Sequence, residues 1–301
     1  ESNMITRRCF TINTSLAFIG LGLGAQMPAS RAATGTTEGF GAAMKRIEAS
    51  SGGRLGVAVL DSASGARMGY RDNEAFPMCS TFKVLAAGAV LTQVDAGHAR
   101  LSDRVRFTRD AVVTYSPITK DRIGGEGMTL AELCDAAIRY SDNTAGNLLL
   151  GQIGGPPGLT QFARTLGDPV TRLDRTETDL NEAGPGDPRD TTTPAAMLSN
   201  LKNLVLGSAL SESSRDQLVA WLKGNTTGGT RLRAGLPTDW VVGDKTGSGG
   251  RGSTNDIAVI WPAERKPIVV TAYLTGTEAP AEQRNAALAS VGRAVVAAVT
   301  G

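Results

Sequence analysis

Strand-type sequence patterns at both ends of the chain enclose a long stretch of helical pattern. The apolar run Leu55–Asp61, the turn residues Ser64-Gly65 and the run Ala66–Tyr70 predict a β-hairpin near the N-terminus. Strand patterns return only near the C-terminus, at Trp240–Lys245, Asp256–Trp261 and Ile268–Leu274. One sheet is therefore expected to form from both ends of the chain, with a helical domain inserted between its parts.

The middle of the chain, from Thr81 to about Asn225, shows the periodicity of amphipathic helices. Its apolar segments are Val84–Val94, Leu130–Tyr140, Thr144–Ile153, Leu159–Leu166, Pro194–Val205 and Ser211–Leu222. An Ala- and Val-rich helix is predicted over Glu282–Val299. The irregular stretch from Arg175 to Asp190 has the length of a compact Ω-loop, whose neck an ion pair between these two residues would close. A linker is the alternative interpretation.

The N-terminal region is typical of an export signal. Arg7-Arg8 precedes a weakly apolar run, Leu16–Ala25, and Ser30–Ala33 offers small residues to a signal peptidase. We interpret residues 1–33 as a signal of the twin-arginine type, with Glu1–Asn3 as an addition from cloning. A membrane-spanning helix is the alternative, but the apolar run is short and rich in glycine.

Charge and cysteine content narrow the function classes. Removal of residues 1–33 takes three of the 31 Lys and Arg and one of the 29 Asp and Glu, so the mature chain is formally neutral. No basic run remains that could hold a phosphate backbone, and nucleic acid is not an expected partner. The mature chain keeps Cys79 and Cys134, for which we favour free thiols over a disulfide.

Ser80 and Lys83 have the spacing of a serine nucleophile and its base. Because His98 is the only histidine, a serine nucleophile is expected to take its base from lysine or glutamate. Ser80 falls at the expected start of a helix, which places Lys83 one turn later on the same face. The same spacing recurs at Ser199 and Lys202 on an ordinary amphipathic helix, so this pair alone is weak evidence.

Further motifs distinguish Ser80 from that second pair. Ser141-Asp142-Asn143 and Lys245-Thr246-Gly247 follow it in order, and Glu177 lies between them in the Ω-loop. Singly, the first motif could cap a helix, the second could be a strand entering a turn, and Glu177 could be a solvated side chain. Together they resemble the motifs of the class A serine β-lactamases, over nearly the whole mature chain.

The resemblance implies an α+β fold of two domains with the active site at their junction. A five-stranded antiparallel sheet flanked by helices would be formed by residues 34–71 and 226–301. An inserted all-α domain would span residues 72–225, with the Ω-loop at 175–190. The disulfides of some members are not expected, because the partner positions in Ala86–Gly88 and at Gly249 hold no cysteine.

By resemblance, Ser80 attacks the lactam carbonyl, and the backbone N–H groups of Ser80 and Ser248 form the oxyanion hole. Ser141 relays a proton to the leaving nitrogen, and Asn143 contacts the acylamide side chain of the substrate. The compensating cation for the substrate carboxylate is Arg231, with Arg233 as a less favoured substitute. The residues expected to bind the substrate, with Asn143, are Tyr115, Arg231, Lys245, Thr246, Gly247 and Ser248.

Deacylation depends on Glu177, which with Asn181 is expected to hold the hydrolytic water and to act as its base. The base for acylation stays open between Lys83 and Glu177 acting through water. A penicillin-binding protein lacks such a carboxylate, so its acyl-enzyme persists.

The resemblance implies a hydrolase that opens penicillins and cephalosporins and confers antibiotic resistance, with carbapenem hydrolysis left open. Its partners would be small-molecule β-lactam substrates and inhibitors, without a metal or organic cofactor. The mature protein is expected to be a periplasmic or secreted monomer with no membrane anchor. Two alternatives are a penicillin-binding sensor or transpeptidase that is acylated without turnover, and a glutaminase-like amidase.

Overall fold

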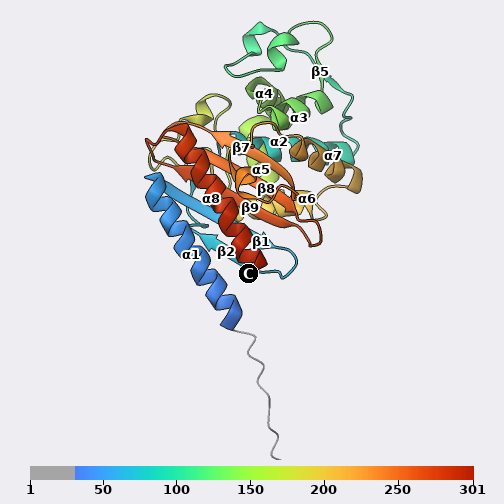
Figure 1. The fold of residues 1–301 in the computed structure, drawn as a ribbon. Coiled ribbons are helices and arrows are strands. Elements are labelled where there is room, and N and C mark those ends of the chain that lie inside the picture. Colours follow the sequence, from blue (N-terminus) through green and yellow to red (C-terminus); the bar gives the residue numbers. More distant parts are fainter. Residues whose placement is uncertain (1–30) are drawn as a thin grey trace, which may run out of the picture.

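A five-stranded antiparallel sheet lies at the centre of the computed structural model, which describes residues 31–301 (Figure 1). The strands are β1 (Arg54–Asp61), β2 (Arg67–Tyr70), β7 (Val241–Ser248), β8 (Thr254–Trp261) and β9 (Ile268–Thr275). Their order, β2-β1-β9-β8-β7, confirms a sheet drawn from both ends of the chain. Of the predicted export signal, residues 1–30 lie outside the described residues.

Strand β9 joins the two ends of the chain. Val57 of β1 lies opposite Ala272 of β9, which lies opposite Asp256 of β8. The predicted hairpin of β1 and β2 is present. β7 pairs with β8 as far as Ser248, so the strand runs past its predicted end at Lys245 and includes the whole Lys-Thr-Gly motif.

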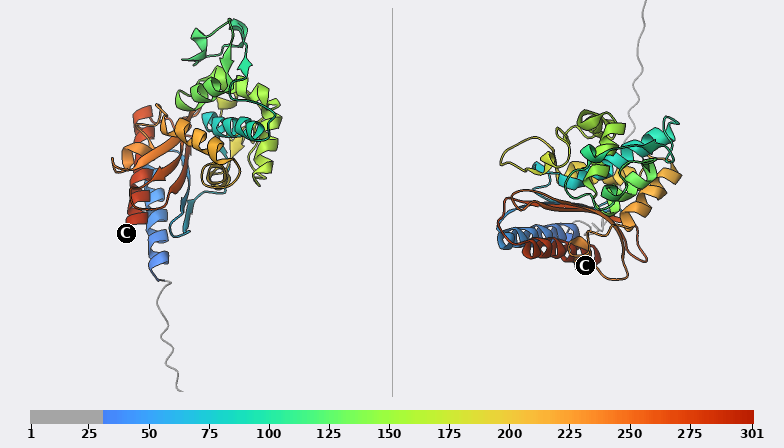
Figure 2. Two further views of the ribbon diagram at one scale, coloured as in Figure 1. Left: turned by 90° about the vertical axis from the view of Figure 1, so that its right-hand side faces the viewer. Right: turned by 90° about the horizontal axis from the view of Figure 1, so that it is seen from above.

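Helices α1 (Arg31–Ser51) and α8 (Ala281–Thr300) cover one face of the sheet, and the other helices cover the opposite face (Figure 2). Successive residues of a strand point to opposite faces. Val57 accordingly packs in the core with α8, and Ala58 packs in the core with the middle helices. The apolar pattern of the sequence predicted α8 but not α1.

Six helices from the middle of the chain, all of them predicted, cover the face of the sheet opposite α1 and α8. They are α2 (Phe82–Asp95), α3 (Leu130–Arg139), α4 (Asn143–Gln152), α5 (Gly155–Thr165), α6 (Pro194–Val205) and α7 (Glu212–Lys223). α2 is buried from Phe82 to Leu91, because the other helices surround it. α3 begins with a capping box in which the side chains of Thr129 and Glu132 each accept a hydrogen bond from the other's backbone N–H.

Short elements that the sequence did not predict connect these layers. β3 (Phe76–Pro77) pairs with β6 (Thr191–Thr192) and joins the segment before Ser80 to the residues after the Ω-loop. β4 (Arg104–Val105) pairs with β5 (Met128–Thr129). The 3-10 turns are η1 (Cys79–Thr81), η2 (Arg109–Ala111), η3 (Thr119–Asp121), η4 (Asp179–Asn181) and η5 (Leu232–Gly235).

Across residues 31–301, no helix combines the length and the apolarity that a membrane crossing needs. Cys79 and Cys134 are both buried and free. The exact domain boundaries after residues 71 and 225 stay a prediction.

Candidate active site

Ser80 lies in turn η1, which leads directly into α2, and only 7% of the residue is exposed. Asn255 on β8 holds the segment before it, because its Nδ2 donates to the carbonyls of Pro77 (2.9 Å) and Met78 (3.1 Å). β7 approaches so closely that a Cβ on Gly247 would lie 2.9 Å from the Met78 carbonyl oxygen. Glycine is therefore required there, and the nucleophile candidate is fixed against the sheet.

The side chain of Lys83 is fully buried among four oxygen atoms. Its Nζ lies 2.9 Å from Ser80 Oγ, 2.8 Å from the Ser141 carbonyl, 2.7 Å from Asn143 Oδ1 and 3.0 Å from Glu177 Oε1. An ammonium group has only three protons, so these four oxygens compete for them. Burial lowers the pKa of Lys83, and the negative charge of Glu177 opposes that shift.

Glu177 is 4% exposed, so its interpretation as a solvated side chain is wrong. Ser80 Oγ donates to its Oε1 at 3.1 Å, and Asn181 Nδ2 donates to its Oε2 at 2.5 Å. One carboxylate thus contacts the nucleophile candidate on one side and Asn181 on the other. An oxygen held in this way can accept a proton from the serine or from a water beside it.

Asn147 on α4 fixes the backbone of Glu177 from both sides, although no motif in the sequence pointed to this residue. Its Oδ1 accepts from the Glu177 N–H at 2.8 Å, and its Nδ2 donates to the Glu177 carbonyl at 2.9 Å. The helical domain therefore positions the Ω-loop through one amide side chain.

The neck of the Ω-loop is closed by Arg175 and Asp190. Arg175 Nε donates to Asp190 Oδ2 at 2.6 Å, and Asp190 Oδ1 accepts from the backbone N–H groups of Asp174 (2.7 Å) and Arg175 (2.9 Å). The Asp190 carbonyl accepts from the Met78 N–H at 2.9 Å. The loop is thus anchored to the segment that carries Ser80.

Ser141 lies between two lysines in the connection from α3 to α4. Its carbonyl accepts from Lys83, and its hydroxyl accepts from Lys245 Nζ at 2.9 Å. Its backbone φ of 58° falls in the left-handed region, which is rare for residues other than glycine and is enriched at functional sites. Burial holds the pKa of Lys245 well below its usual range, and the positive charges of Lys83 and Arg231 lower it further.

A cavity of about 350 Å³ opens in front of these groups. Arg231 lies at its wall, where Nη2 donates to Ser248 Oγ at 2.6 Å and Nη1 donates to the Gly247 carbonyl at 2.8 Å. Arg233 instead binds Asp244 through two nitrogens, at 2.8 and 2.6 Å. The cavity is lined by Ser80, Tyr115, Ser141, Asn143, Asn181, Thr227, Arg231, Thr246, Gly247 and Ser248.

Of two further cavity residues, one was predicted from the sequence and the other was not. Tyr115, which was predicted from the sequence, is 57% exposed at the cavity. Thr227, which was not predicted, shares a hydrogen bond of 2.5 Å with Thr246 through their hydroxyl groups. Across the described residues, no three His, Cys, Asp or Glu side chains are grouped as metal ligands would be.

Taken together, the geometry provides a serine with two bases within reach, a second serine between two lysines, and a cationic wall. This set can form and hydrolyse an acyl-serine on a substrate that carries a carboxylate.

Comparisons with known proteins agree with this chemistry. The model of the family described as "Beta-lactamase enzyme family" matches residues 40–299. Beta-lactamase CTX-M-8 of Citrobacter amalonaticus is 56% identical over 249 residues, which are 83% of this chain and 85% of that protein. Beta-lactamase OXY-2 of Klebsiella oxytoca is 50% identical over 267 residues, or 89% of this chain and 92% of that protein.

A solved structure of an ancestral (GNCA) class A β-lactamase has the same fold, with a TM-score of 0.85 at 61% identity. The match covers 86% of this chain and 99% of that chain. The sequence identity, the family match and the shared two-domain fold show that the chain belongs to the class A serine β-lactamases.

Proposed function

We propose that this protein hydrolyses β-lactams, penicillins and cephalosporins among them, through an acyl-serine intermediate, and so confers antibiotic resistance. The observation that carries the proposal is the position of Ser80 Oγ, 2.9 Å from Lys83 Nζ and 3.1 Å from Glu177 Oε1. A serine becomes a nucleophile when a neighbouring base takes its proton, and both neighbours are bases when deprotonated.

Acylation begins when Ser80 Oγ attacks the lactam carbonyl as its proton passes to Glu177 or Lys83. The backbone N–H groups of Ser80 and Ser248 stabilise the oxyanion. When the C–N bond of the ring breaks, the Ser141 hydroxyl gives its proton to the leaving nitrogen. Lys83 or Lys245, which both contact Ser141, replaces that proton.

Deacylation has one base where acylation has two. Glu177 and Asn181, whose side chains lie 2.5 Å apart, hold the hydrolytic water, and Glu177 takes its proton as the water attacks the ester. The proton returns to Ser80 when the ester breaks. A sensor or transpeptidase would lack this second step.

The substrate carboxylate is assigned to Lys245, Thr246 and Ser248, with Arg231 as the supporting cation. Arg233 is unsuited to this role because Asp244 already holds its guanidinium. Asn143 and Tyr115 contact the acylamide side of the substrate. No metal or organic cofactor takes part in these steps.

The working form of the protein is proposed to be a monomer, exported to the periplasm or the medium by the signal at residues 1–33. The twin-arginine assignment rests on Arg7-Arg8 and the weakly apolar run that follows.

The test replaces the deacylation base by Glu177→Gln. Loss of the Glu177 charge removes a contribution that raises the pKa of Lys83, so more of Lys83 is in the neutral amine form that can accept the serine proton, and acylation continues. A chromogenic cephalosporin should then give one equivalent of product, and mass spectrometry should find the acyl-enzyme. Glu182→Gln, at a side chain that is 63% exposed in the same loop, is the control and should turn over normally.

Sustained turnover by Glu177→Gln would contradict the role of that residue. A single burst from the unsubstituted protein would instead favour the sensor or transpeptidase, and ammonia release from glutamine would favour the amidase.

A further inference from the structure

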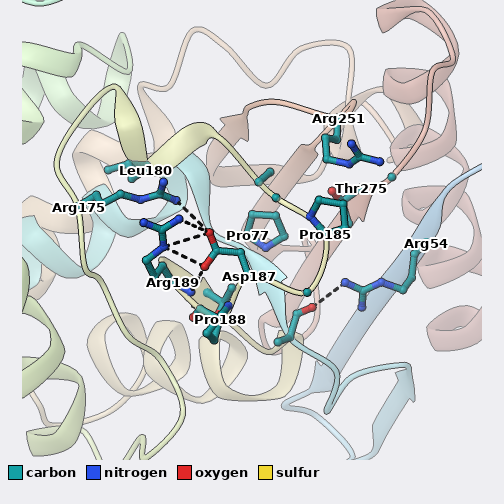
Figure 3. A pocket seen from close by; sticks show the side chains of 16 residues that line it. Arg54, Pro77, Arg175, Leu180, Pro185, Asp187, Pro188, Arg189, Arg251 and Thr275 are labelled. Atoms are coloured by element: carbon teal, nitrogen blue, oxygen red, sulfur yellow. Dashed lines mark hydrogen bonds and ion pairs between the residues drawn. The ribbon is translucent and has the colours of Figure 1, made fainter.

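A second cavity, of about 380 Å³, lies behind the Ω-loop and shares no lining residue with the catalytic cleft (Figure 3). Its walls are the Ω-loop, the segment before Ser80, and the turn between β7 and β8 together with the end of β9. The volume falls in the range of about 300–1,000 Å³ that small-molecule sites occupy. The assigned chemistry at Ser80 does not use this cavity.

Much of the cavity wall is apolar. Leu180 is buried in the Ω-loop, and Pro185 and Pro188 lie further along it. Ala75 and Pro77 line the cavity from the other side. The exposed Pro185 and Pro188 give the cavity a firm apolar surface, which favours a compact apolar or aromatic ligand.

The charged residues of the wall are four arginines and a single aspartate. Three of the arginines are engaged: Arg54 donates to the Ala75 carbonyl (2.8 Å) and pairs with Glu74, Arg175 pairs with Asp190, and Arg189 pairs with Asp187.

Arg251 is different, because its guanidinium makes no ion pair or hydrogen bond with any residue between 39 and 301. Figure 3 shows it without a dashed line at the rim, where Pro185 and Thr275 also line the cavity. Its backbone is fixed, since its carbonyl accepts from the N–H groups of Gly276 (2.9 Å) and Thr277 (3.2 Å). The cavity therefore offers an anion one available guanidinium on a held backbone.

We propose that this cavity binds a small amphipathic carboxylate. The apolar body of the ligand packs on Pro185 and Pro188, and its carboxylate forms a charge-assisted pair with Arg251.

The site also contacts the deacylation machinery, a point that rests on the proposed function. Leu180 precedes Asn181 in η4, and Arg251 follows Gly250, whose N–H donates to the Asn181 carbonyl at 2.7 Å. A ligand in the cavity thus lies beside the residue before Asn181 and beside the residue after Gly250. Because Asn181 holds Glu177, occupancy is expected to slow deacylation more than acylation.

The test measures binding of 4-phenylbutyrate to the mature protein by calorimetry, with 4-phenylbutanol as a probe of the same length without the charge. Arg251→Leu should weaken phenylbutyrate binding about tenfold or more. The matched control is Arg106→Leu, at another exposed arginine without a partner in the described part of the chain, and it should leave the affinity unchanged. Ala75→Trp, at an exposed position, should fill the cavity and also weaken binding.

Lys245→Met shows whether the probe occupies the catalytic cleft instead. Loss of binding in Lys245→Met, with binding kept in Arg251→Leu, would place the carboxylate in the catalytic cleft and overturn the proposal. The absence of any binding to the unsubstituted protein at millimolar probe would also overturn it. Calorimetry needs no turnover, so this result is independent of the proposed hydrolysis. An unchanged deacylation rate at saturating probe would refute only the coupling.

Discussion

Replacement of Asn147 by alanine should separate the two halves of the catalytic cycle. The amide of Asn147 makes two hydrogen bonds to the Glu177 backbone, at 2.8 and 2.9 Å, and none to Ser80 or Lys83. The substitution Asn147→Ala therefore frees the deacylation base and leaves the nucleophile and its lysine in place.

The magnitudes follow from those two bonds. Each contributes about 0.5–1.5 kcal/mol net, so the free energy of unfolding should fall by about 1–3 kcal/mol. For a chain of this size that is a Tm decrease of roughly 5 °C. A displacement of about 1 Å can cost about 100-fold in rate, so deacylation should slow by that order. Acylation should slow less than deacylation, because Lys83 remains beside Ser80 as a second base.

The assay is a stopped-flow time course with a chromogenic cephalosporin, combined with mass spectrometry of the quenched protein. Asn147→Ala should show a burst of one equivalent, then slow turnover with the acyl-enzyme accumulated. Asn200→Ala is the matched control, since Asn200 Nδ2 donates to Asp168 Oδ2 at 2.6 Å in a buried place outside the catalytic cleft. It should lower Tm by a similar amount without a burst.

The reasoning fails if Asn147→Ala loses stability as calculated and yet keeps kcat within about twofold of the parent. The two bonds would then support the fold without positioning Glu177.

Two other substitutions test the charges around the cleft. Burial holds the pKa of Lys245 well below its usual value of about 10.4. As pH rises, Lys245 therefore loses its charge early, and KM for an anionic substrate should increase. In Lys245→Arg, which stays protonated, this alkaline decrease of kcat/KM should move to higher pH. Arg175→Leu removes the partner of buried Asp190 and should lower the free energy of unfolding, measured with denaturant, by about 3–5 kcal/mol. The control Arg172→Leu breaks a more exposed pair with Asp174 and should lower it by less than about 1 kcal/mol. An equal cost for both arginines would exclude a special role of the neck.

The sequence predicted the sheet and seven of the helices because their apolar residues repeat with the period of the element they form. It did not predict α1, whose first part contains Gly35, Gly39 and Gly41 and has low helix propensity. That helix depends on tertiary packing, in which Phe40 and Met44 join the core shared with α8. A pattern local to the segment could not reveal that support.

The residues of the active site also fall into two groups, those that the sequence predicted and those that it did not. The serines, lysines and glutamate of the motifs could be named because their side chains carry the reaction chemistry. Asn147 and Asn255 could not, since each acts by binding backbone atoms of a segment distant in the sequence. An asparagine on a helix or strand has no spacing that identifies such a partner. The chemistry of the site was thus predictable, and the contacts that position it were not.

Those positioning contacts converge on the short segment before Ser80. Asn255 holds the carbonyls of Pro77 and Met78 from the sheet, and the neck of the Ω-loop holds the Met78 N–H through the Asp190 carbonyl. The sheet and the Ω-loop therefore both bind the backbone of the segment that carries Ser80, while the helical domain binds the Ω-loop through Asn147. A protein that only needs to be acylated requires the first set of contacts alone. Hydrolysis requires both, because the base for water must be fixed as firmly as the serine that it deacylates.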